Sequence, residues 1–147
     1  MGKGVNKEKV KTVGSLLLKH GFSVRANLVI AFPNEGHKQV WETINYGIEL
    51  AQIGIQNIIF LRYTPYPGSA YFKLCQERGQ IPPYGPEFDN FLMTTVSGEL
   101  TRVISYTPQL SGRAVKIYLI LATMLTQVVF MLFFPFKWMR SVRNVLT

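Results

Sequence analysis

The stretch IIFLRYTPYPGSAYFKLCQERG, residues 58–79, decides how the rest of the chain is interpreted. Its first residues are apolar and β-branched, which is typical of a buried strand. Prolines and a glycine interrupt the run at residues 64–68, and Ser69 then opens a helical pattern that stops at Gly79. The stretch therefore predicts a strand, a sharp turn at its carboxyl end, and a capped helix.

The residues before this stretch repeat the same alternation of helix and strand. A second apolar, β-rich run is closed by Pro33, and Asn34 is the expected N-cap of the helix that follows. The expected elements are helix 5–20, strand 23–32, helix 35–53, strand 56–62 and helix 69–78. This order predicts an α/β fold with parallel strands and right-handed crossovers. The turn at 64–68 then lies at the carboxyl edge of the sheet, where ligands of α/β folds gather.

Both predicted strands look buried on two faces, yet the chain supplies too few neighbouring strands to cover them. We therefore expect a partial (β/α) barrel that belongs to something larger. The predicted division is an α/β part at 1–81, a loop-rich connector at 82–108, and a hydrophobic helical tail at 109–147. Within the connector, residues 87–92 are expected to form one short turn of helix.

Charge and cysteine content exclude several functional classes. Residues 1–99 carry ten Lys/Arg and eight Asp/Glu, whereas residues 100–147 carry six Lys/Arg and no acid. Most of the excess positive charge thus lies in the C-terminal tail. This argues against a nucleic-acid interface, which would need a stripe of basic residues on a folded face. Cys75 is the single cysteine, so no thiolate cluster for a metal is expected. The polar first residues show no signal peptide, which predicts a cytosolic location or the cytoplasmic side of a membrane.

The last third contains twenty consecutive residues without a charge, Ile117 to Phe136, flanked on both sides by cations. At about 1.5 Å per residue this length matches the roughly 30 Å core of a bilayer. Thr123, Thr126 and Gln127 lie mid-segment and count against a simple span. We expect membrane association through residues 113–140, as a span or as an interfacial helix. The alternative is a helix buried within a larger protein.

Three motifs occur in order: MGKG at 1–4, AFPNEG at 31–36 and PYPGS at 65–69. Over roughly residues 1–81 the chain resembles the C-terminal half of the barrel of radical S-adenosylmethionine enzymes, in the group that carries a cobalamin-binding domain. That group has a Gly-x-Pro-Gly-Glu-Thr strand end, so Ala31 stands where glycine is usual, and Asn34 and Gly36 replace its Gly and Thr. The Cys-x-x-x-Cys-x-x-Cys loop and the first barrel half have no counterpart here.

The resemblance implies S-adenosylmethionine and a [4Fe–4S] cluster in the parent enzyme, with cobalamin as a possible further cofactor. It implies radical chemistry or methyl transfer on an unreactive carbon. This chain lacks the cluster ligands, so we expect a fragment or split subunit that is inactive alone, with no catalytic residue and no metal ligand of its own. Its partner would be the missing N-terminal barrel half or another chain.

Three residues are the candidates for contact with the cofactor. Asn27 shares one strand face with Arg25, Val29 and Ala31, and it either bonds the cofactor or is satisfied by backbone. Glu35 either caps the following helix or contacts the ligand. Gly68 shapes the turn and permits close approach of backbone to a ligand. A second hypothesis of another class is a non-catalytic, membrane-anchored interaction protein that completes its half-barrel with a partner chain.

Overall fold

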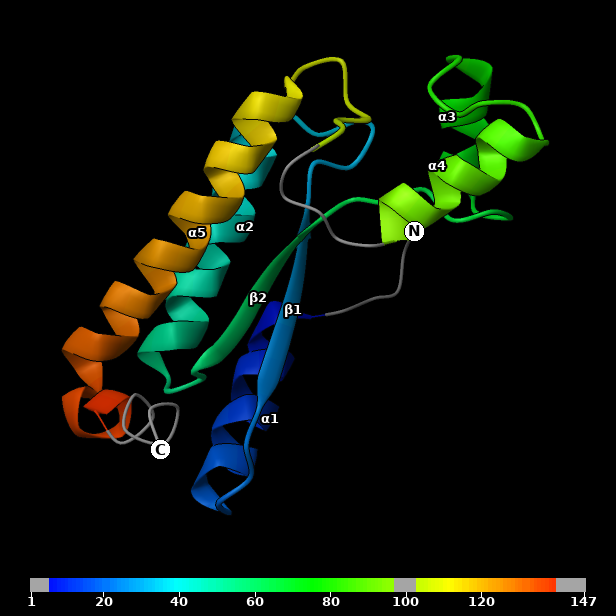
Figure 1. Ribbon diagram of the computed structural model, residues 1–147. Helices are drawn as coiled ribbons and strands as arrows, with labels where there is room; N and C mark the ends of the chain where they lie inside the picture. Colours follow the sequence, from blue (N-terminus) through cyan, green and yellow to red (C-terminus); the bar gives the residue numbers. More distant parts are fainter. Residues whose placement is uncertain (1–5, 97–102, 140–147) are drawn as a thin grey trace. The chain divides into compact units, whose positions relative to one another are not determined.

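The computed structural model describes residues 6–96 and 103–139 of the chain (Figure 1). It is a mixed helix and strand structure with a two-stranded parallel sheet, β1–β2, and one long apolar helix, α5. The elements are α1 (Lys7–Lys19), β1 (Arg25–Ile30), α2 (His37–Gln52), β2 (Asn57–Arg62), α3 (Ala70–Glu77), α4 (Pro86–Val96) and α5 (Gly112–Phe133). The predicted α-β-α-β-α order is therefore confirmed.

The start of α2 differs from the prediction for a local reason. The helix begins at His37, and the N–H of Gly36 donates to Gln39 Oε1 at 3.0 Å. This contact, together with the bond from the N–H of Val40 to the Gly36 carbonyl at 3.2 Å, makes Gly36 the N-cap, so the assignment of that role to Asn34 was wrong. The prediction for α3 is confirmed, because Ser69 Oγ accepts a hydrogen bond from the N–H of Phe72 at 3.1 Å.

One element toward the C-terminus is longer than the sequence suggested. The expected single turn at 87–92 is an eleven-residue helix, α4, with Pro86 at its first position and acids in its first turn. Helix α5 begins at Gly112, within the predicted helical tail at 109–147. It ends at Phe133, two positions before Pro135, which cannot continue a helix.

The sheet is covered on one face only within the described part of the chain. In β2, Ile58 and Phe60 are buried while Ile59 is 38 % exposed. Helix α2 packs on the buried face, and a Cβ at Gly47 would lie 2.5 Å from the Phe60 ring, so only glycine fits there. The expectation that both faces of the strands are buried was wrong, because no described element covers the opposite face.

The chain divides into two compact units that interleave along the sequence. The first comprises Met1–Leu28, Glu42–Phe60 and Ile120–Thr147, and the second comprises Val29–Trp41 and Leu61–Leu119. In the first unit, Gly54 approaches Leu18 and Phe134. The core of the second unit consists of Tyr63, Phe72, Cys75, Ile81, Phe88 and Tyr106. The division into parts at 1–81, 82–108 and 109–147 stays a prediction.

Helix α5 has two rows of side chains that differ in exposure. The buried row is Val115, Leu119, Ala122, Thr126 and Phe130, and the outward row is Leu121, Met124, Val128 and Leu132, which are 39–68 % exposed. Thr126 Oγ1 donates to the carbonyl of Ala122 at 2.9 Å, and the Gln127 amide donates to the Gln56 carbonyl at 3.4 Å. Thr126 and Gln127 are thus bonded to protein carbonyls, and the four residues of the outward row are apolar.

Candidate functional site at the strand ends

The carboxyl ends of the two strands meet at one edge of the sheet. The N–H of Tyr63 donates to the carbonyl of Ile30 at 2.8 Å and extends the pairing to the last residue of β1. Because the strands are parallel, loop 31–36 and loop 64–69 leave the sheet at this same edge. Both loops belong to the second unit. The arrangement predicted for residues 64–68, a turn at the carboxyl end of a parallel strand, is confirmed.

The first loop begins with a residue in an unusual backbone conformation. Ala31 is buried, at 3 % exposure, and has a φ of 64°, the left-handed region that favours glycine. For an L-residue this conformation costs roughly 1–2 kcal/mol. Among the described residues it is the single non-glycine with positive φ. Ala31 therefore holds a backbone conformation that glycine adopts more readily.

Residues of the first loop form hydrogen bonds with one another. The N–H of Glu35 donates to the carbonyl of Phe32 at 2.8 Å, and Glu35 Oε2 accepts from the N–H of Phe32 at 3.2 Å. The carboxylate thus caps the turn that precedes α2. A residue in a costly conformation persists where its surroundings fix it, and these two bonds fix the turn after Ala31.

Two residues that the sequence did not single out hold the first loop from outside. Thr107 is 3 % exposed, and its Oγ1 donates to the Glu35 carbonyl at 2.7 Å. Arg78, at the end of α3, donates from Nη1 to the carbonyl of Pro33 at 3.2 Å. No local pattern signals Thr107, because its partner lies 72 positions away. Arg78 was visible only as a cation at a helix end, a common and unspecific feature.

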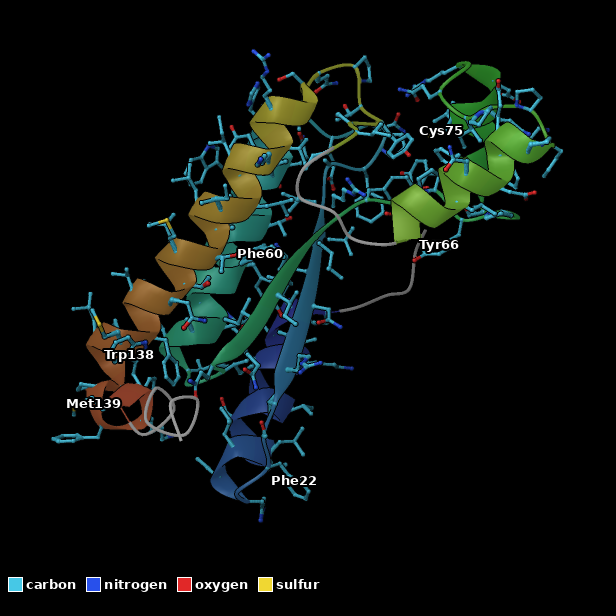
Figure 2. The ribbon with its side chains drawn as sticks, in the orientation of Figure 1. Phe22, Phe60, Tyr66, Cys75, Trp138 and Met139 are labelled. Atoms are coloured by element: carbon cyan, nitrogen blue, oxygen red, sulfur yellow. The ribbon has the colours of Figure 1, made fainter. Side chains whose placement is uncertain are left out.

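The second loop is tight but open toward solvent. Ser69 Oγ donates to the carbonyl of Tyr66 at 2.8 Å while it caps α3. Gly68 has a φ of 83°, and a Cβ built there would meet no atom within 4 Å. Tyr66 is 63 % exposed (Figure 2). The backbone at Gly68 and the ring of Tyr66 are therefore accessible to a ligand at this loop.

Aromatic rings pack between the two loops. The ring centroids of Phe32 and Tyr63 are 4.9 Å apart, and those of Tyr63 and Tyr71 are 5.8 Å apart. Tyr106 adds an edge contact to Tyr63 at 6.2 Å. Burial raises the pKa of the Tyr63 phenol above its ordinary value, so this group stays protonated at neutral pH. The aromatic rings therefore make the region between the two loops packed and uncharged.

The structure brings two of the three predicted contact residues to the same edge. Glu35 and Gly68 both follow strand ends in the second unit. Asn27 lies on the exposed side of β1, in the first unit. Glu35 uses one carboxylate oxygen on the backbone of Phe32, and Gly68 faces open space. Their contact with a cofactor stays a prediction.

The cysteine does not fit the role of an iron–sulfur ligand. Cys75 is fully buried in the core of the second unit (Figure 2), and burial raises the pKa of its thiol, with Arg78 opposing this in part. Cluster iron is held by thiolates, which this environment disfavours. In residues 6–96 and 103–139 there is also no group of three or more His, Cys, Asp or Glu side chains placed to hold a metal.

Comparison with known proteins gives no match to a family model, to a curated protein or to a solved structure. The function is therefore inferred from the chain's own motifs and geometry. The features that bear on it are the strained strand end at Ala31, the open turn at Gly68, the uncovered sheet face and the apolar outward row of α5.

Proposed function

We propose that the chain is the C-terminal part of a radical S-adenosylmethionine-type barrel, in which loops 31–36 and 64–69 form one wall of the cofactor and substrate site. The observation that carries the proposal is Ala31, which keeps a glycine-like φ of 64° at the strand end. A site that retains this conformation with an unsuited residue is expected to need the backbone path for function. The motif resemblance identifies that path with the glycine-containing strand end of the family.

The half-barrel architecture is a further element of the proposal. Its support is the two-stranded sheet with one uncovered face, on which Ile59 and Leu61 are 38 % and 44 % exposed. In a barrel such apolar residues face an interior filled by side chains from other strands. The [4Fe–4S] cluster would be held by cysteines of another barrel part, because Cys75 does not fit. Cobalamin, and methyl transfer to an unreactive carbon, belong to the proposed parent enzyme and not to this chain alone.

S-adenosylmethionine, when bound, would supply the methyl group or the adenosyl part of the reaction. Within the second unit, the residues of this chain would contribute contacts through the backbone at Gly68 and the exposed ring of Tyr66. A contact of the Asn27 amide, in the first unit, stays a prediction. Glu35 would act by holding the loop, since its carboxylate bonds the backbone of Phe32. Each of these roles is one of binding or shaping the site.

Membrane association through α5 is the second part of the proposed function. Gly112–Phe133 is the one helix in the described part of the chain that is long and apolar enough to span a membrane, and 28 % of its most apolar 18-residue window is buried. A core helix of a soluble protein would be mostly buried. Residues 113–140 would place the barrel at the cytoplasmic side of a membrane. Washing membranes with alkaline carbonate tests this, since release of the full chain into the soluble fraction contradicts membrane insertion.

Titration calorimetry of the detergent-extracted chain with S-adenosylmethionine tests the site itself. Gly68→Ala and Gly21→Ala form a matched pair, because their φ values are 83° and 82° and neither Cβ would meet an atom within 4 Å. Both substitutions add similar backbone strain, of about 1 kcal/mol. We expect weak binding that Gly68→Ala lowers at least fivefold and Gly21→Ala leaves unchanged. Equal effects, or no binding by the unaltered chain, would contradict the proposed site.

The uncovered face also supports the second candidate function, a membrane-anchored protein that completes its sheet with a partner and performs no catalysis. This alternative predicts that the chain forms a stable complex while binding no S-adenosylmethionine. Size-exclusion chromatography of the extracted chain, alone and with co-purified partners, combined with the calorimetry, separates the two. A monodisperse monomer that resists unfolding would count against both.

A further inference from the structure

A groove in the first unit runs between α1 and β1. It has a volume of about 590 Å³, within the range of ligand-sized sites. Most of its surface is apolar. It is lined by Asn6, Lys9, Val10, Val13, Gly14, Leu17, Val24, Arg25, Ala26, Asn27, Leu28, Tyr46, Leu50 and Ile55. All of these residues belong to the first unit.

The groove follows the edge of β1 and not one of its faces. Five consecutive residues, 24–28, line it. Successive strand side chains point to opposite faces, so an unbroken run can border a groove only along the backbone edge. β1 pairs with β2 on its other side, and no other described strand joins the sheet (Figure 1). The groove therefore exposes a row of strand N–H and C=O groups, which is a template for a further strand.

The opposite wall of the groove is an apolar stripe on α1. Val10, Val13 and Leu17 are spaced as one helix face and are 36 %, 54 % and 37 % exposed. Gly14 completes this wall, and a Cβ there would lie 3.1 Å from Ile55. A strand laid along β1 would direct alternate side chains onto this stripe, as strands beneath the helices of α/β folds do.

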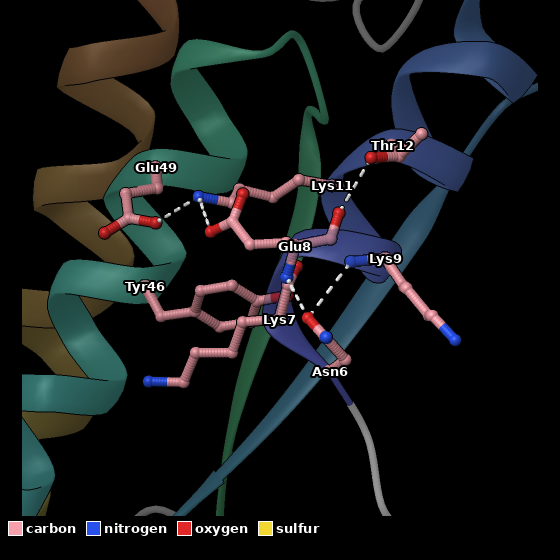
Figure 3. A network of polar contacts seen from close by, with 8 residues as sticks. All are labelled: Asn6, Lys7, Glu8, Lys9, Lys11, Thr12, Tyr46 and Glu49. Atoms are coloured by element: carbon pink, nitrogen blue, oxygen red, sulfur yellow. Dashed lines mark hydrogen bonds and ion pairs between the residues drawn. The ribbon is translucent and has the colours of Figure 1, made fainter.

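Polar contacts between α1 and α2 keep this wall in place (Figure 3). Lys11 Nζ lies 3.0 Å from Glu49 Oε2 and 2.7 Å from Glu8 Oε1, and Tyr46 Oη donates to the carbonyl of Lys7 at 3.4 Å. Asn6 caps the start of α1 through the N–H groups of Glu8 and Lys9. The groove is thus bounded by a helix fixed at its N-terminal half.

The charge at the groove selects among possible occupants. Lys9 and Arg25 both line it, both are exposed, and neither forms an ion pair with a described residue. An occupant with a carboxylate near either cation is favoured by charge complementarity, and a second copy of this chain, with its formal net charge of +8, is not.

We propose that the groove between α1 and β1 receives an extended β-strand of a partner polypeptide, with alternate apolar side chains against Val10, Val13 and Leu17 and an acidic residue beside Arg25. This is strand addition to an open sheet edge. The inference deepens the proposed barrel function by naming the element that completes the sheet. It concerns the first unit, and its test uses no cofactor, so its failure and that of the S-adenosylmethionine site are told apart.

The test tethers a strand to the full chain. A segment of alternating valine and threonine with one glutamate is fused before Met1 through a Gly/Ser linker, which gives an effective concentration in the millimolar range. The matched control replaces two valines by proline, which cannot pair as a strand. Hydrogen exchange of the amides at 24–28 is measured by mass spectrometry. We expect exchange to slow at least tenfold with the alternating segment and not with the proline control.

Two variants sharpen the result. Val13→Trp fills the groove from an exposed position and should abolish the protection. Exchanging the glutamate of the segment for lysine should weaken it, and Arg25→Glu should restore it. Equal exchange with both tethers would overturn the proposal. Protection of the same amides by dodecanoate but not by the tethered strand would also overturn it, and would assign the groove to an acyl chain.

Discussion

The loop at the end of β1 and the edge of the same strand differ in how far the chain completes its own bonding. In loop 31–36, Glu35, Thr107 and Arg78 supply partners to the backbone, and a strained residue is held in place. Along residues 24–28 the described chain supplies no strand for the second edge. The difference teaches that the loop at the end of β1 is bonded within this chain, whereas the second edge of β1 meets no described strand.

The largest effect is expected where the outward row of α5 is given a charge. Met124→Lys places a cation on a residue that is 60 % exposed in an apolar row, at a cost near the centre of a bilayer of about 2.5–3.5 kcal/mol. We expect the variant to lose most of its membrane-bound fraction in vesicle flotation. The control is Leu16→Lys on α1, which is 54 % exposed and lies outside α5. If both variants float as the unaltered chain does, α5 is not held by lipid.

Thr107→Val removes one of the contacts that hold loop 31–36. The substitution keeps the shape and removes the 2.7 Å bond to the Glu35 carbonyl, which leaves a buried acceptor without this donor. The expected loss is about 1–3 kcal/mol in the free energy of unfolding by urea. Thr12→Val is the control, since Thr12 Oγ1 bonds the Glu8 carbonyl on an exposed helix surface. A loss no greater than that of the control would mean that the loop does not depend on Thr107.

Ala31→Gly should change the stability of the same loop in the opposite direction, by making it more stable. Glycine adopts a φ of 64° without the steric cost of a Cβ, so we expect stabilisation by about 1 kcal/mol. Ala26→Gly, in the middle of β1, should instead destabilise by roughly 0.5–1 kcal/mol. Thermal unfolding of both variants measures the difference. Destabilisation by Ala31→Gly would contradict the left-handed conformation on which the proposed function depends.

The smallest effect concerns the contact that fixes the groove wall. Hydrogen bonds that Lys11 donates to Glu8, and then to Glu49, raise the pKa of Lys11 above its ordinary value of 10.5. A raised lysine pKa contributes stability below pH 10.5, and this stability is lost as the pH rises through the higher folded-state pKa. The stability difference between the unaltered chain and Lys11→Met should therefore vanish at strongly alkaline pH. A difference that grows above pH 10.5 would contradict the contact.

Local signals in the sequence predicted most of the helices and strands, but not the contacts that hold them in place. Ser69 and Gly79 mark the ends of α3 correctly, because capping depends on neighbouring residues. The N-cap of α2 was misplaced, since Asn34 and Gly36 both suit the role and only the bond to Gln39 decides. Thr107 could not be found, because its contact with Glu35 is made across 72 positions.

The groove was hidden from sequence reasoning for a different physical reason. The periodicity of Val10, Val13 and Leu17 predicts an apolar stripe, and such a stripe normally indicates a buried helix face. In the structure the same residues are 36–54 % exposed. A sequence pattern reports which side of a helix is apolar, but it does not report whether the covering element is supplied by the same chain.

Residue-resolved amide exchange across β1 in the unaltered chain tests the central claim most directly. Backbone N–H groups alternate between the two edges of a strand, so those directed to β2 should exchange slowly and those between them quickly. The account predicts this alternation within Arg25–Ile30, with at least a tenfold difference between neighbours. Uniformly slow exchange through all of β1 would show that its second edge is already covered, and would contradict a sheet that awaits a partner strand.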